Sequence, residues 1–101
     1  MIQCCYLYIF GGLDPAVHHA EIPSEDFTMT VIGCGSYEQA EQAALEMVRK
    51  GCPVIEVCPG FGHEGVARIQ KAVGPDVPVG VVRFDLHPCI NNRSGDSVFA
   101  G

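Results

Sequence analysis

Two consecutive strand–helix–strand units limit the possible folds of this chain more than any other feature of its sequence. The strand segments 27–33, 53–58 and 77–84 are rich in Val and Ile. Helices are predicted between them, at residues 36–50 and 63–73, from apolar side chains that recur at helical spacing. Because such crossovers are right-handed and join parallel strands, the pattern predicts an α/β domain built on βαβ units.

Both helices carry sequence signals for their ends. Ser36 and Gln39 fit a capping box, in which each side chain bonds a backbone N–H group near the helix start. Gly51 suits a left-handed stop after the first helix, and Gly74 followed by Pro75 ends the second. We therefore expect two well-bounded helices.

The N-terminal quarter of the chain is less regular. Residues 2–10 are almost all apolar or aromatic and predict a buried strand. Asp14 and Pro15 then start a short helical turn that runs to Ala20, and the stretch up to Asp26 is acidic and loop-like. Because this turn is thin for a crossover, the first strand could run parallel or antiparallel to the others.

The resulting expectation is one α/β domain over residues 1–101, a length that suits a single core. It has a four-stranded, mainly parallel sheet and two main helices, akin to a small doubly wound domain. The polar and glycine-bearing segment 90–101 predicts a mobile C-terminal tail, with Val98 and Phe99 apolar enough to dock on the domain.

Composition restricts the partners of the chain. A net charge of −6 argues against binding to nucleic acid or to anionic membranes. A signal peptide has a basic segment before its apolar stretch, and none precedes the first apolar stretch here. No apolar run is long enough to span a bilayer, so a cytoplasmic location is expected. A hydrophobic content of 48% is explained by a homo-oligomer, a dimer or higher, or by a well-filled core.

Six cysteines are present without C-x-x-C spacing or a paired zinc-ribbon pattern. Most of them lie in or beside apolar strand-like runs, where Cys behaves as a small hydrophobic residue. In a cytoplasmic chain this pattern predicts free thiols.

A glycine-rich turn, residues 58–65, joins the predicted strand 53–58 to the predicted helix 63–73. Gly60 and Gly62 allow the backbone to approach a ligand closely, and the helix N-terminus favours an anion. The G-x-G-x-x-G spacing with Gly65 is matched by spacing alone, so a nucleotide cofactor is not expected. A tight turn that only caps the helix explains the same glycines.

Four ionisable residues near the ends of two strands are candidates for catalysis. His63 and Glu64 open the second helix, and Asp85 and His87 point the same way in extended chain. An Asp-x-His pair can orient a general base, and His63, Asp85 and His87 together could hold a divalent metal. Each also has a structural explanation, as a first-turn acid, a helix cap or a strand-ending turn.

Glu56 and Arg83 are charges inside apolar strands. If the strands are neighbours, the two side chains can meet on one face of the sheet. An unpaired charge there would be costly, so an ion pair between them is expected. The pair either holds the sheet together or forms the floor of a pocket in which Arg83 binds a carboxylate or phosphate.

The segments Gly60-Phe61-Gly62-His63-Glu64-Gly65 and 79–88 (VGVVRFDLHP) resemble those of a family of small bacterial proteins of about this length, classed as a domain of unknown function. The likeness extends over nearly the whole chain. It implies a cytoplasmic one-domain α/β protein, and it supplies no activity, substrate or catalytic residue.

Three functions remain open from the sequence. The chain could bind a small anionic molecule, a carboxylate or phosphate, at the carboxyl ends of its strands, with or without catalysis. It could carry a divalent metal at His63, Asp85 and His87. It could also be a non-catalytic module that assembles with itself or with a partner.

Overall fold

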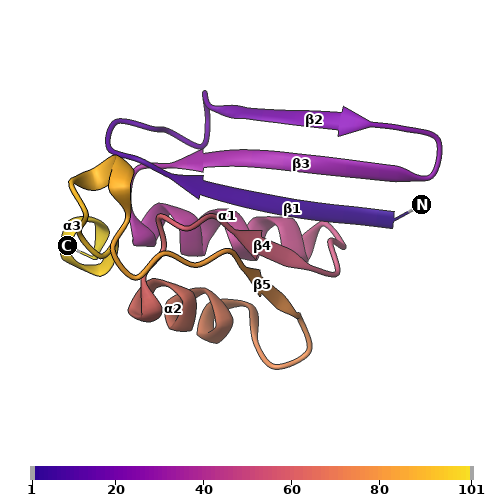
Figure 1. The fold of residues 1–101 in the computed structure, drawn as a ribbon. Helices are drawn as coiled ribbons and strands as arrows, with labels where there is room; N and C mark the ends of the chain where they lie inside the picture. Colours follow the sequence, from indigo (N-terminus) through magenta and orange to yellow (C-terminus); the bar gives the residue numbers. More distant parts are fainter. Residues whose placement is uncertain (1, 101) are drawn as a thin grey trace.

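The computed structural model describes residues 2–100, in which one sheet with the strand order β2-β3-β1-β4-β5 lies over helices on a single face (Figure 1). Its elements are β1 (Ile2–Ile9), β2 (His19–Pro23), β3 (Phe27–Cys34), α1 (Tyr37–Arg49), β4 (Ile55–Val57), α2 (His63–Val73), β5 (Val79–Val81), the 3-10 helix η1 (Pro88–Ile90) and α3 (Asp96–Phe99).

The sheet has five strands and is mixed, where four mainly parallel strands were expected. β1 is central and runs parallel to both β3 and β4, and β4 runs parallel to β5. The additional strand is β2, which pairs antiparallel with β3 in a region predicted to be a turn and an acidic loop. Its side chains are all exposed, so edge pairing through the backbone, rather than an apolar pattern, defines this strand.

Both main helices cover the same face of the sheet, so the doubly wound expectation is wrong (Figure 1). The path from β3 to β4 and the path from β4 to β5 move in the same direction across the sheet. Right-handed crossovers that move in one direction place their helices on one side, whereas a doubly wound sheet reverses direction. Among residues 2–100, no main helix therefore lies on the other face of the sheet.

The core lies between the sheet and the two helices. Along β1, Cys5, Leu7 and Ile9 point into it and are buried, while Tyr6 and Tyr8 alternate onto the uncovered face and are half-buried. Across the core, Tyr37 of α1 is fully buried and stacks on Phe61, with 5.6 Å between ring centroids. All six cysteines are free, as predicted.

The first helix begins as its sequence signals indicate. The Ser36 hydroxyl accepts a hydrogen bond from the N–H of Gln39 at 3.2 Å. The Gln39 side chain in turn accepts one from the N–H of Gly35 at 2.6 Å, one residue earlier than an ideal capping box. The chain leaves the helix through Gly51, whose φ of +95° suits glycine. The second helix has the predicted bounds, His63–Val73.

The C-terminal segment, expected as a mobile tail, folds back over the domain in its described part. Ile90 of η1 and Phe99 of α3 are buried in the core, and the Phe99 ring lies 6.3 Å from that of Tyr37. Gly95, just before α3, lies directly against the backbone of Gly60. None of the helices in residues 2–100 has the length and apolar character needed to cross a membrane.

Candidate ligand-binding cleft

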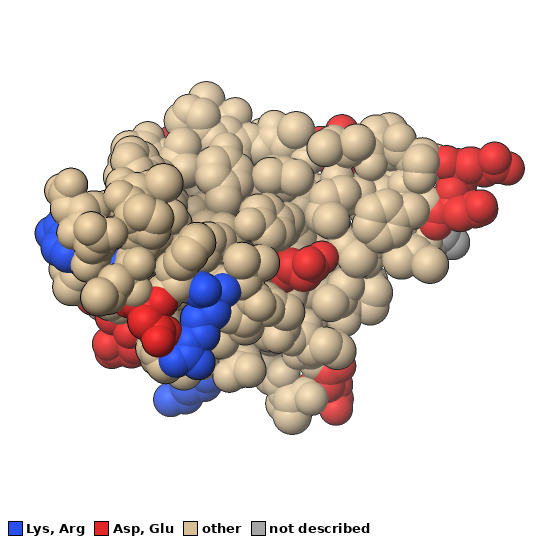
Figure 2. Space-filling view, viewed as in Figure 1, with Lys and Arg blue, Asp and Glu red and all other residues tan. Residues whose placement is uncertain are grey.

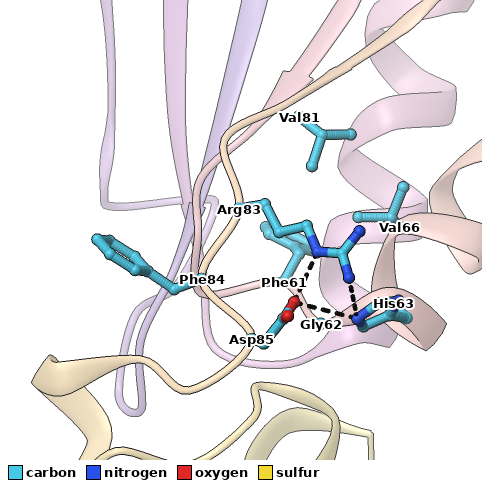
Figure 3. A pocket seen from close by; sticks show the side chains of 8 residues that line it. All are labelled: Phe61, Gly62, His63, Val66, Val81, Arg83, Phe84 and Asp85. Carbon is cyan, nitrogen blue, oxygen red and sulfur yellow. Dashed lines mark hydrogen bonds and ion pairs between the residues drawn. The ribbon is translucent and has the colours of Figure 1, made fainter.

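A cleft of about 320 Å³ lies between the start of α2 and the chain that follows β5 (Figure 3). It is at the carboxyl ends of β4 and β5, where ligands bind in parallel sheets. The residues that line it are Phe61, Gly62, His63, Val66, Val81, Arg83, Phe84 and Asp85.

Arg83, Asp85 and His63 form an ionic cluster at the mouth of this cleft (Figure 3). The Arg83 Nε donates to Asp85 Oδ1 at 2.6 Å, and the same oxygen lies 3.2 Å from His63 Nε2. The Arg83 Nη2 lies 2.8 Å from His63 Nε2. All three side chains are more than half exposed, so they are accessible to a ligand.

One ring nitrogen of His63 faces both partners, and its proton decides which contact is a hydrogen bond. Without a proton, Nε2 accepts from the Arg83 guanidinium, which can only donate. With a proton, Nε2 donates to the carboxylate of Asp85 instead. The hydrogen bond from Arg83 holds the pKa of Asp85 below its usual value against the effect of desolvation, so this carboxyl is ionised at neutral pH.

The inner wall of the cleft is apolar. Val81 of β5 lies above the guanidinium of Arg83 and Val66 of α2 lies beside it, while the Phe61 ring lies behind the Arg83 side chain (Figure 3). The Phe84 ring extends away from the ionic cluster and contacts the His87 ring, with 5.1 Å between centroids. The cleft therefore combines one cationic anchor with a small apolar surface.

The four predicted catalytic residues are only partly brought together. His63 and Asp85 are in contact, whereas His87 Nδ1 accepts a hydrogen bond from the N–H of Cys89 and caps η1. Glu64 is exposed in the first turn of α2, outside the cleft lining. Among residues 2–100, no three His, Cys, Asp or Glu side chains are placed to hold a metal ion together.

The expected Glu56–Arg83 ion pair does not form within the part of the chain that the structure describes, because Arg83 contacts Asp85 and His63 instead. Glu56 pairs in register with Gly80, and both face the uncovered side of the sheet. Arg83 follows Gly80 by three positions, and an odd spacing in extended chain points a side chain to the opposite face. The predicted ion pair is therefore wrong because the two side chains point to opposite faces of the sheet, although the two strands are neighbours.

The anion position expected at the start of α2 is filled by the protein itself. Asp96 accepts hydrogen bonds from the N–H groups of Glu64 and Gly65, each at 3.0 Å. The Tyr37 hydroxyl donates to Asp96 Oδ1 at 2.7 Å and accepts from the N–H of Gly62 at 3.0 Å. Gly62 thus serves this internal network. A Cβ at Gly60 would meet Ile9, and the missing Cβ of Gly95 lets that residue lie against the Gly60 carbonyl.

This network sets the protonation of Asp96. Burial acts to raise its pKa, but the N–H of Glu64, the Tyr37 hydroxyl and the N–H of Gly65 together hold the pKa below its ordinary value. Sequence reasoning missed both side chains, because Tyr37 fits the apolar stripe of α1 and Asp96 lies in a polar tail. A glycine directly before an acidic residue, as at 95 and 96, is the one local signal of a close approach.

These observations define a small two-layer α/β domain with a polar cleft at the carboxyl ends of two parallel strands. The chain belongs to a family of unknown function, DUF6506, whose model matches residues 2–97 and so includes the whole cleft as well as Tyr37 and Asp96. The resemblance to such a family is thereby confirmed. No curated protein and no solved structure matches the chain.

Proposed function

We propose that this protein binds a small anionic molecule, a carboxylate or a phosphate ester with a compact apolar body, in the cleft between α2 and β5. The observation that carries the proposal is the state of Arg83. Its Nε and Nη2 are engaged by Asp85 and His63, which leaves Nη1 and its two N–H donors for a ligand. A guanidinium already fixed by two partners loses little freedom when an anion binds.

The surroundings of Arg83 favour an amphiphilic ligand. Val66 and Val81 offer apolar surface directly beside the guanidinium, and a volume of about 320 Å³ accepts only a small molecule. Asp85 neutralises Arg83, so the cluster becomes net positive only when His63 takes up a proton. Binding of an anion should therefore be stronger when His63 carries a proton than when it is neutral.

A titration monitored by amide NMR shifts tests the proposal. The probes are isobutyrate and benzoate for carboxylates, and inorganic phosphate and phenyl phosphate for phosphates. We expect shifts centred on Gly62, Val66 and Val81, and R83Q should weaken the affinity at least about tenfold through loss of a charge-assisted contact. R49Q, in the last turn of α1, is the control with the same charge change.

Two results would overturn this function. The first is the absence of shifts at the cleft for every probe at millimolar concentration. The second is an R83Q affinity equal to that of R49Q and the unsubstituted chain, which would place the binding elsewhere. Comparing pH 6 with pH 8, and repeating the comparison in H63Q, shows whether the proton on His63 contributes the positive charge.

A further inference from the structure

The face of the sheet opposite the helices is apolar and uncovered. The strand register places on it the side chains of Ile2, Cys4, Tyr6, Tyr8, Ala20, Ile22, Phe27, Met29 and Val31, together with Glu56 of β4. Ile2 of the central strand β1 is 62% exposed, and Ile22 of the edge strand β2 is 61% exposed. An apolar surface of this extent on a small domain marks an interaction site.

Charges are arranged around this face rather than on it. Among the strand residues that the register places here, Glu56 carries the one charge. Figure 2 shows a broad area without charge over β1, β2 and β3, with most acidic and basic side chains toward the margins. The Tyr8 ring covers Gly33 on the neighbouring strand, which closes the hollow that the glycine would leave.

We propose that a second copy of this chain covers the face, so that two sheets pack against each other in a homodimer. Sheets stacked in this way lie about 10 Å apart and interdigitate the apolar side chains of their facing surfaces. This proposal concerns a surface separate from the cleft and does not depend on the ligand. Such an interface would account for the high hydrophobic content of the sequence.

The size of the face fits a dimer. The five strands have 8, 5, 8, 3 and 3 residues. At about 3.3 Å per residue and about 4.8 Å between strands, the flat footprint is roughly 430 Å² per copy. Side-chain relief makes the accessible area larger, so two copies together bury about 1,000 Å², which is the lower bound for a specific interface.

The composition favours a second copy over a different protein. Interfaces between identical chains are apolar at their centre, with Tyr, Phe and Met enriched and charged residues depleted. Complementary charges contribute to the specific recognition of a different partner, and among the described strand residues of this face only Glu56 is charged. Each copy carries a net charge of −6, so association requires a contact surface from which charges are excluded, as here.

Light scattering during size-exclusion chromatography tests the proposal on the full chain. The unsubstituted protein should have twice the 10.8 kDa mass of one chain at micromolar concentration. M29K places a lysine near the centre of the face in both copies, and I22K places one at its edge. We expect M29K to be monomeric and I22K to raise the dimer dissociation constant about tenfold or more, because each charge is buried against its copy.

Q70K, on the exposed side of α2, is the control that adds the same charge away from the sheet. Circular dichroism shows whether each variant is folded, and I22K, at an exposed position, remains informative if M29K unfolds. A monomeric unsubstituted chain at about 100 μM would overturn the proposal, whether the face is then free or covered by another protein. So would I22K and Q70K variants that dimerise equally well, since the interface would then lie elsewhere.

Discussion

The two main helices of this protein begin in different ways. α1 is capped by Ser36, the residue directly before it, as a short sequence motif predicts. α2 has Gly62 at its N-cap position, which has no side chain to cap the helix. Asp96 caps it instead, by accepting from the N–H of Glu64, 32 residues earlier in the chain. One helix start is therefore capped by a neighbouring residue, and the other is capped by the C-terminal segment.

This difference makes the start of α2 and the segment from η1 to α3 one cooperative unit. Asp96 bonds two N–H groups of α2, and Tyr37 of α1 bonds both Asp96 and Gly62. His63 stands in the same first turn of α2 and faces the cleft. The geometry of the ionic cluster therefore depends on contacts that the C-terminal segment supplies, whereas the Ser36 cap of α1 does not.

The largest effect is expected from G95A, which should loosen the distant cap without touching Asp96. Gly95 has φ −56° and ψ −29°, which any residue adopts, so the substitution creates no backbone strain. An added Cβ would instead strike the backbone of Gly60 and Gly62, which has little room to move. We expect a loss of about 3 kcal/mol in the free energy of unfolding, measured by urea denaturation.

G11A is the matched control for this steric argument. Gly11 lies in the turn after β1, its φ is not positive, and an added Cβ there meets no atom within 4 Å. The free energy of unfolding should change by less than about 0.5 kcal/mol. Equal stabilities for G95A and G11A would show that the close approach of the C-terminal segment does not limit the fold.

The next largest losses in the free energy of unfolding are expected from substitutions at the two helix caps. D96N keeps the size of the side chain but removes the charge and places an amide against N–H groups that need acceptors, which should cost about 2 kcal/mol. S36A removes a single hydroxyl acceptor from the start of α1 and should cost about 1 kcal/mol.

Amide hydrogen exchange separates the local cap from the distant one. In D96N, exchange should increase together in the first turn of α2 and in residues 94–99, because the same carboxylate joins them. In S36A, the increase should stay within the first turn of α1. An S36A variant that also releases residues 94–99 would contradict the local character of the Ser36 cap.

Local signals predicted those parts of the fold that local physics determines. The start and end of α1 follow from Ser36, Gln39 and Gly51, and the bounds of α2 follow from its apolar spacing and Gly74. β2 was missed because an exposed edge strand has no apolar pattern to read. The placement of both helices on one face depends on strand order, which is a property of the whole chain.

The same distinction applies to the candidate site. Asp85 and Arg83 meet because they are two residues apart in extended chain, and a single crossover brings His63 to them. His87 lies in the same segment, yet the turn into η1 directs its ring to Phe84 and the N–H of Cys89. The Asp96 contact crosses 32 residues without a motif, so only a three-dimensional structure could reveal that the helix N-terminus is already occupied.

The smallest effect, and the most specific, is the pH dependence of the distant cap. The ordinary pKa of an Asp side chain in an unfolded chain is about 3.9. The pKa of Asp96 in the folded protein lies below that value. Its contribution to stability is therefore complete above about pH 4 and is lost as pH falls through the lower, folded-state pKa.

The difference in the free energy of unfolding between the unsubstituted chain and D96N should shrink between pH 6 and pH 2.5, because Asn does not titrate. The difference for S36A should stay constant over the same range, since a hydroxyl does not titrate there either. Parallel pH profiles for the unsubstituted chain and D96N would mean that the carboxylate of Asp96 is not the group that holds α2 to the C-terminal segment.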